Sequence, residues 1–174
     1  MLAFGYGFLY NRLKVGNCGE KWVKGPASSQ AGGDEVLTGE YQHAVDAKGR
    51  LNVPARLREE LGDRFVVTKG LDGCLFVYSY PEWERILEKL RQLPLSTGRN
   101  LKRFLASGAA EVEVDKQGRI LIPPSLRAWA KLEKDVVVAG VIDRAEIWNR
   151  AAWEEGPTQI GADEIALEME QLGF

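Results

Sequence analysis

The chain has 174 residues, a hydrophobic content of 45% and a formal net charge of −2. This length suits one ordinary domain or two very small ones, and the composition allows a packed core. The charge balance excludes a protein that is basic throughout, so a nucleic-acid surface would have to be a local patch of Lys and Arg. Cys18 and Cys74 have no CxxC or Cys/His spacing, which argues against a disulfide framework or a zinc site and favours a reducing compartment. The apolar stretches are too short to span a bilayer.

Residues 1–35 differ in composition from the rest of the chain. They combine scattered aromatic residues, many glycines and the stretch GPASSQAGGDE, without a sustained helical or strand period. Residues 1–10 lack the basic region of a secretory signal and are not followed by a small-residue cleavage site. Codons for Ala31 to Asp34 can spell a purine-rich ribosome-binding sequence, and Val36 can be encoded by the start codon GTG. We therefore expect 1–35 to be a non-native or disordered extension; a genuine flexible tail is the alternative.

The remaining chain contains two matching segments, DAKGRLNVP at 46–54 and DKQGRILIP at 115–123. After an offset of one residue the match continues through Tyr78 with Trp148 and Trp83 with Trp153. Each copy is too small to bury a generous core by itself, so we expect the two copies to pack together as an intrachain pseudo-dimer. The predicted organisation is a first unit at 36–93, a linker helix at 94–108, and a second unit with a C-terminal helix at 109–174.

The first unit begins with a strand–turn–strand pattern. Alternating residues predict strands at 41–45 and 51–53, and Gly49 supplies the positive φ that closes the turn between them. Pro54 ends the second strand and opens a short helix at ARLREEL. Two further strands are predicted at RFVVT and CLFVY.

Three helices with apolar stripes are predicted in the rest of the chain. The first starts at Ser79, whose spacing to Glu82 indicates a capping box, and Asn149 is the matching cap in the second copy. The second lies at about 100–106 and directs Leu101, Phe104 and Leu105 inward. The third is the acidic, amphipathic C-terminal stretch ADEIALEMEQL. Such stripes are more typical of core or subunit contacts than of a cofactor pocket.

The sequence contains no motif for nucleotide hydrolysis, dinucleotide binding or zinc-protease chemistry. His43 is the only histidine, so neither a catalytic triad nor a His-rich metal site is predicted, and a residue on the sheet surface is the simpler interpretation. We expect a protein that is not an enzyme and binds no cofactor or metal.

The repeated DxxGR turn is the informative feature. Asp46 and Asp115 can accept backbone N–H bonds within their turns, Gly49 and Gly118 can adopt positive φ, and Arg50 can pair with Asp46 across the hairpin. Such a turn does not require an arginine twice, yet both copies have one. Arginine on a rigid hairpin can bind phosphate or donate two hydrogen bonds to a guanine edge. The predicted DNA-binding residues are Lys48, Arg50, Arg56 and Arg58 in the first copy and Lys116 and Arg119 in the second.

The stretches GEYQHAVDAKGRLNVPARLREEL and DKQGRILIPPSLR resemble the MraZ family of bacterial transcriptional regulators, which is related to AbrB-type swapped-hairpin proteins. The resemblance extends from about Val36 to the C-terminus and agrees with a start at Val36. It implies an α+β protein of two tandem AbrB-like β-hairpin/helix units, forming a small β-barrel flanked by helices. Asp46 with Arg50 and Asp115 with Arg119 match the family motif, whereas Lys48, Arg56, Arg58 and Lys116 are added from local charge.

The resemblance also implies a function. It implies a cytoplasmic, nucleoid-associated protein that binds double-stranded DNA at short direct repeats and represses its own division and cell-wall gene cluster. Ring-like homo-oligomers would place several equivalent hairpins on successive repeats. The alternative is an antitoxin that binds a protein toxin, although a second folded unit here occupies the place of the usual toxin-binding tail. An enzymatic or small-molecule-binding barrel would require a polar pocket that the sequence does not indicate.

Overall fold

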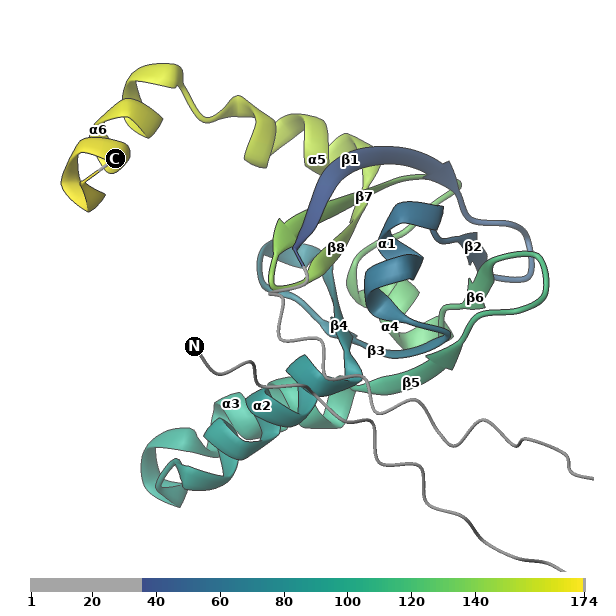
Figure 1. Cartoon of the computed structure of the whole chain (residues 1–174), viewed down its shortest axis with the longest axis horizontal. Coiled ribbons are helices and arrows are strands. Elements are labelled where there is room, and N and C mark those ends of the chain that lie inside the picture. The colour runs from purple at the N-terminus through teal and green to yellow at the C-terminus, as the bar shows by residue number, and fades with distance from the viewer. Residues whose placement is uncertain (1–35, 174) are drawn as a thin grey trace, which may run out of the picture. The chain divides into compact units, whose positions relative to one another are not determined.

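The computed structural model describes residues 36–173, and the predicted extension at 1–35 lies outside the described residues (Figure 1). Short 3₁₀ turns lie at Leu71–Gly73 and Pro157–Gln159. The other elements are, in chain order, β1 (Leu37–Ala44), β2 (Arg50–Asn52), α1 (Ala55–Leu61), β3 (Arg64–Lys69), β4 (Leu75–Ser79), α2 (Tyr80–Gln92), α3 (Leu95–Gly108), β5 (Ala110–Glu113), β6 (Arg119–Leu121), α4 (Pro124–Trp129), β7 (Asp135–Ile142), β8 (Ala145–Asn149), α5 (Arg150–Glu155) and α6 (Ala162–Leu172).

The main sheet joins the two copies by strand exchange. Its six strands are all antiparallel, in the order β1-β7-β8-β4-β3-β5. The first strand of the first copy, β1, pairs with β7 of the second copy, and β5 pairs in the equivalent way with β3. The equivalent strands β4 and β8 pair with each other at the centre. The predicted α+β class and the intrachain pseudo-dimer are thus confirmed.

The predicted barrel is not closed. β1 and β5 are the two edges of the main sheet and do not pair with each other. After β1 ends, Val45 forms one isolated antiparallel bridge with Leu51 of β2. β2 itself pairs with β6 as a separate two-stranded ribbon. Each ribbon strand has only three residues, which is too short to join both edges of the main sheet. We call this two-stranded sheet the β2–β6 ribbon.

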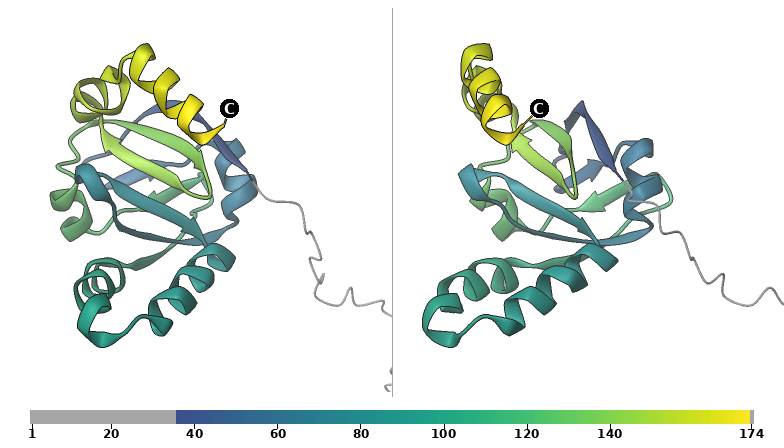
Figure 2. Two further views of the ribbon diagram at one scale, coloured as in Figure 1. Left: turned by 90° about the vertical axis from the view of Figure 1, so that its left-hand side faces the viewer. Right: turned by 60° about the vertical axis from the view of Figure 1, so that its left-hand side comes forward.

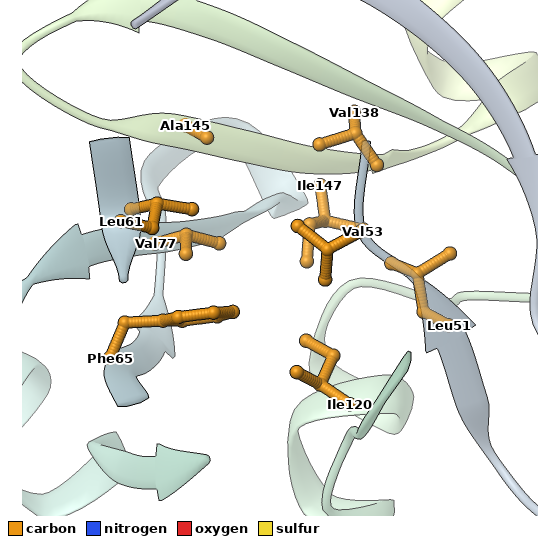
Figure 3. Close-up of a pocket in the computed structure, with 9 residues that line it drawn as sticks. All are labelled: Leu51, Val53, Leu61, Phe65, Val77, Ile120, Val138, Ala145 and Ile147. Carbon is orange, nitrogen blue, oxygen red and sulfur yellow. The ribbon is translucent and has the colours of Figure 1, made fainter. Parts of the chain in front are cut away.

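An apolar core fills the space between the main sheet and the β2–β6 ribbon. Leu51 and Ile120, which are cross-strand partners in the ribbon, are both fully buried there, as is Phe65 of β3. The pocket drawn in Figure 3 is lined only by apolar side chains from both copies, which point toward one another across the core. It is therefore the packed centre of the pseudo-dimer and offers no polar group to a ligand.

A second apolar cluster covers the other face of the sheet and preserves the symmetry of the two copies. The rings of Tyr78 and Trp83 lie 5.9 Å apart, and the matched rings of Trp148 and Trp153 lie 5.8 Å apart. These pairs attach α2 to β4 and α5 to β8 in the same way. The aromatic positions matched in the sequence therefore perform the same packing role in each copy.

Two details of the predicted helices are wrong. Ser79 precedes α2, but its side chain makes no capping hydrogen bond, and Glu82 pairs with Arg85 at 2.9 Å instead. Asn149 does cap α5, because its side-chain oxygen accepts the N–H groups of the first turn. Leu101 is exposed, whereas Leu105 of the same predicted stripe contacts the second cluster. No helix within residues 36–173 is long and apolar enough to cross a membrane.

Strand exchange brings β1 and β7 into close contact at Gly140. A Cβ atom added there would lie 2.5 Å from the backbone nitrogen of Thr38 and 2.6 Å from the backbone carbon of Leu37. Because these atoms belong to a paired strand, they cannot move aside without disturbing the β1–β7 ladder. We expect Gly140→Ala to lower the free energy of unfolding by about 1–3 kcal/mol, the range typical of overpacking. Gly161→Ala is the control, since nothing lies within 4 Å of its added Cβ, and equal urea midpoints for both variants would contradict the prediction.

Candidate nucleic-acid interface

The first DxxGR turn is closed by hydrogen bonds from one aspartate. Oδ1 of Asp46 accepts the backbone N–H groups of Lys48 and Arg50, each at 2.9 Å. Its Oδ2 accepts Nε of Arg50 at 2.7 Å and lies 2.7 Å from Nη2. Gly49 has φ +82° and donates its N–H to the carbonyl oxygen of Asp46. The aspartate therefore shapes the backbone of the turn and also orients the arginine that follows it.

The second turn repeats this geometry. Oδ1 of Asp115 accepts the N–H groups of Gln117 and Arg119 at 2.8 and 3.0 Å, and its Oδ2 accepts Nε and Nη2 of Arg119 at 2.9 and 2.7 Å. Gly118 has φ +79°. The structural role expected for the aspartates and glycines is thus present in both copies. Within residues 36–173 the recorded side-chain hydrogen bonds and ion pairs of both arginines use Nε and Nη2 and leave Nη1 unbonded.

Both aspartates are stabilised in their charged form. The backbone N–H of Arg50 is the largest cause that lowers the pKa of Asp46, followed by its side chain. For Asp115 the side chain of Arg119 is the largest cause, and the pKa falls to about 2. Because the folded-state pKa is depressed, this contribution to stability is complete above the ordinary pKa of 3.8 and is lost as the pH falls through about 2. Both ion pairs are therefore intact at neutral pH.

The β2–β6 ribbon places the two arginines on one surface. Arg50 pairs with Leu121, Leu51 with Ile120, and Asn52 with Arg119. The central pair is buried, so strand alternation directs the other four side chains to the outer face of the ribbon. Arg50 and Arg119 are diagonal neighbours on this face, which corresponds to about 7–8 Å between their backbones. Their side chains keep 32% and 25% of their area exposed.

Arg58 and Arg127 connect each turn to the helix of the other copy. Arg58 Nε donates to the carbonyl of Val53 at 3.1 Å, and its guanidinium lies against Gly118 of the second turn. Arg127 donates to the carbonyl of Ile122 at 3.2 Å and lies against Gly49 of the first turn. A Cβ on Gly49 would be 2.7 Å from Cζ of Arg127, so a larger residue would displace this guanidinium in addition to straining the positive φ. Each half-buried arginine therefore supports the opposite hairpin.

The other predicted cations lie around the same end of the protein. Lys48 and Lys116 are exposed within the turns that precede β2 and β6, and Arg56 is exposed on α1. In Figure 1 both turns project beyond the ribbon, on the side away from the six-stranded sheet. The cations here outnumber the two turn aspartates and Glu133, which lies beside Asp46 and Arg127, so the residues at this end carry an excess of positive charge on a chain of net negative charge.

Two residues of this surface were missing from the sequence prediction. Asn52 and Leu121 are exposed on the outer face of the ribbon, and Leu121 keeps 58% of its area. Their alternation with buried Leu51 and Ile120 is a signal that places them on the outer face. Their position between the two arginines could not be predicted, because it depends on the pairing of strands that are far apart in the sequence.

The described residues show no alternative chemical centre. Within 36–173 no group of three or more His, Cys, Asp or Glu side chains could hold a metal ion. His43 is half-buried on β1, opposite Val136, and burial lowers its pKa. Cys74 is a buried thiol whose pKa is raised to about 12, chiefly by desolvation. The polar surface at the β2–β6 ribbon is therefore the strongest candidate site.

Known proteins of one family match most of the described chain. The family model described as "MraZ protein, putative antitoxin-like" matches residues 36–102 and again 105–168. The chain is 54% identical over 143 residues to "Transcriptional regulator MraZ" of Thermoanaerobacter pseudethanolicus, covering 80% of this chain and 100% of that protein. A protein of the same name from Heliobacterium modesticaldum is 61% identical over 122 residues, covering 69% of this chain and 85% of that protein. Two matches to one family model and this coverage lead to one conclusion: the chain belongs to the MraZ family.

Proposed function

We propose that the protein is a transcriptional regulator that binds double-stranded DNA through the outer face of the β2–β6 ribbon. The observation that carries the proposal is the pair of aspartate-oriented arginines, Arg50 and Arg119, on one exposed face. A two-stranded β-ribbon fits the major groove, where arginine can donate two hydrogen bonds to guanine O6 and N7. The Nη1 groups, which the turn aspartates do not use, would donate to a base or a phosphate.

The turns and the ribbon would have different roles on DNA. Lys48 and Lys116 are exposed in the turns that precede β2 and β6. There they suit contacts to phosphate oxygens. Asn52 suits the donor–acceptor edge of adenine, and Leu121 suits the methyl group of thymine. Because Asn52 and Leu121 occupy equivalent positions of the two copies, the surface is not truly two-fold symmetric. Such a surface favours an oriented site over a palindrome.

We further propose a DNA target and an assembly state for the protein. An oriented ribbon suits short direct repeats, and repeats in the promoter of its own division and cell-wall gene cluster would make the protein a repressor of that cluster. The described part of one subunit presents a single ribbon, so useful affinity at cellular salt favours a homo-oligomer, ring-like in form, with several ribbons on one duplex. The protein would act in the cytoplasm, associated with the nucleoid.

Binding of a protein toxin is the second candidate function. The printed description of the matching family model includes the term "antitoxin-like". This role predicts that the protein neutralises a toxin when the two are co-expressed, and that ribbon variants leave that neutralisation unchanged. The arrangement of the ribbon arginines favours DNA, because it provides paired hydrogen-bond donors for a base edge or a phosphate.

Arg50→Ala separates a DNA-binding role from a purely structural one. The Arg50–Asp46 ion pair is partly exposed, so its loss should change the melting temperature little. The same substitution should weaken binding to DNA from upstream of the protein's own gene by about 1–3 kcal/mol per contact, multiplied across the ribbons engaged. Asp46→Ala is the control and should mainly lower thermal stability, because the turn loses its acceptor. Unchanged affinity and unchanged salt dependence in Arg50→Ala would rule out the DNA contact.

Asn52→Ala and Lys48→Ala should differ in their effects on sequence recognition. If Asn52 contacts a base, its truncation should relax the preference at one position of the repeat by about 1–3 kcal/mol. If Lys48 contacts phosphate, its truncation should weaken all sequences alike and reduce the salt slope by about one for each ribbon bound. Fluorescence anisotropy with single-base operator variants, at several salt concentrations, measures both effects. The assignment fails if Asn52→Ala loses affinity equally on every sequence.

The molar mass in solution tests the proposed homo-oligomer. Multi-angle light scattering on the full chain should give a mass several times that of the monomer at micromolar concentration, since each ribbon alone binds weakly. Arg50→Ala should leave this mass unchanged because the ribbon faces DNA. A clean monomer would contradict self-association.

A further inference from the structure

Leu121 is an apolar side chain on an otherwise polar surface. It lies on the outer face of the β2–β6 ribbon with 58% of its area exposed, and it belongs to neither apolar cluster of the described chain. The other large hydrophobic residues that are exposed within 36–173 lie outside the ribbon, on the helices, in the turns and at the start of the main sheet (Figure 2). Packing within the chain therefore gives no reason for a leucine at this position.

Two arginines flank Leu121 on the ribbon. Arg50 is its cross-strand partner, which corresponds to about 4.5–5.5 Å between the two Cβ atoms. Arg119 precedes Leu121 by two residues on the same face, which corresponds to about 6–7 Å along the strand. The equivalent residue of the first copy is the polar Asn52, so an apolar group is present on only one half of this face.

A surface of this composition has a specific complement on double-stranded DNA. The guanidinium groups suit phosphate oxygens or the O6 and N7 atoms of guanine. A leucine gains nothing from these polar atoms and would cost them hydration. The C5-methyl group of a pyrimidine is the apolar group that a base exposes in the major groove. A leucine between two arginines is therefore suited to a pyrimidine methyl group close to a guanine.

We propose that Leu121 recognises the C5-methyl group of one pyrimidine, so that the methylation state of this base controls the affinity of the protein for DNA. The inference rests on the DNA-binding role proposed above and identifies the chemical group that one side chain contacts. Thymine carries this methyl group, and cytosine acquires it when a DNA methyltransferase modifies its C5 atom. Methylation of a cytosine that lies under Leu121 therefore strengthens binding.

The two pyrimidines differ at position 4 of the ring. Thymine has an acceptor oxygen there, whereas cytosine has a donor amino group. The donors of Arg50 and Arg119 favour the acceptor, so the expected order of affinity is thymine, then 5-methylcytosine, then cytosine. Cytosine and its methylated form differ only in the methyl group, so their comparison isolates the contact with Leu121.

Base replacement in the duplex tests the methyl contact. Each thymine of one repeat, in the DNA from upstream of the protein's own gene, is replaced in turn by uracil, and fluorescence anisotropy measures the affinity. At one thymine the loss of the methyl group should weaken binding about fourfold, the factor for one buried methyl group. This thymine should lie within about two base pairs of the guanine at which Arg50→Ala relaxes the preference, because base pairs are about 3.4 Å apart. Cytosine at the same position should bind more weakly still, and 5-methylcytosine should bind about fourfold more tightly than cytosine.

Variants of the leucine show whether this side chain makes the contact. Leu121→Ala should bind the thymine and uracil duplexes equally, whereas Leu121→Met keeps an apolar side chain and should retain most of the difference. Asn52→Ala is the matched control on the other half of the ribbon. It should weaken binding while keeping the fourfold ratio between thymine and uracil. Circular dichroism on each variant verifies that these exposed substitutions leave the sheet folded.

The outcomes separate this inference from the proposed function. A wild-type protein that is indifferent to every replacement by uracil, or a ratio that persists in Leu121→Ala, would overturn the methyl contact and leave DNA binding by the ribbon in place. Equal affinities for cytosine and 5-methylcytosine would overturn control by methylation. A wild-type chain that does not bind the duplex would overturn both the inference and the proposed function.

Discussion

The structure depends on one interaction, the antiparallel pairing of β2 with β6. This short ribbon joins the two copies through the buried pair Leu51 and Ile120 and through hydrogen bonds that continue past the strands. The N–H of Val53 donates to the carbonyl of Gly118, and the N–H of Ile122 donates to the carbonyl of Gly49, both at 3.0 Å. The carbonyl oxygen of each turn glycine thus accepts a hydrogen bond from the other copy. Neither hairpin would have its observed form without the other.

The same pairing explains why the surface can be both rigid and charged. A guanidinium on a mobile loop would lose side-chain entropy on binding, whereas Arg50 and Arg119 are already oriented by their aspartates. Arg58 and Arg127 support the turns from behind, and burial of the central apolar pair fixes which residues face outward. The local positive surface is compatible with an acidic chain because the acidic residues concentrate elsewhere, most clearly on α6.

Duplication followed by divergence accounts for the differences between the two copies. The aromatic pairs Tyr78–Trp83 and Trp148–Trp153 retain the same packing, since both attach a helix to the sheet. The surfaces have diverged where packing places no constraint. Asn52 and Leu121 differ on the ribbon, and basic α3 differs from acidic α6 after it. A true homodimer could have neither difference. The fused chain, by contrast, presents different residues at equivalent positions of the ribbon and different helices after β4 and β8.

The sequence by itself determined the repeat, the two DxxGR turns, the element types and the positions of most helices. These features are local: aspartate capping, positive φ at glycine and apolar periodicity act over a few residues, and α6 was predicted with its observed bounds. The local rule failed at Ser79, where Glu82 pairs with Arg85, and at Leu101, which is exposed although Phe104 and Leu105 of its stripe are packed. Only the tertiary structure decided that β1 and β5 exchange between copies and that the sheet stays open. It also decided that Arg50, Asn52, Arg119 and Leu121 share one face. The physical reason is that strand pairing joins residues about seventy positions apart, and its register follows from burying both copies' apolar faces at once, which no local pattern encodes.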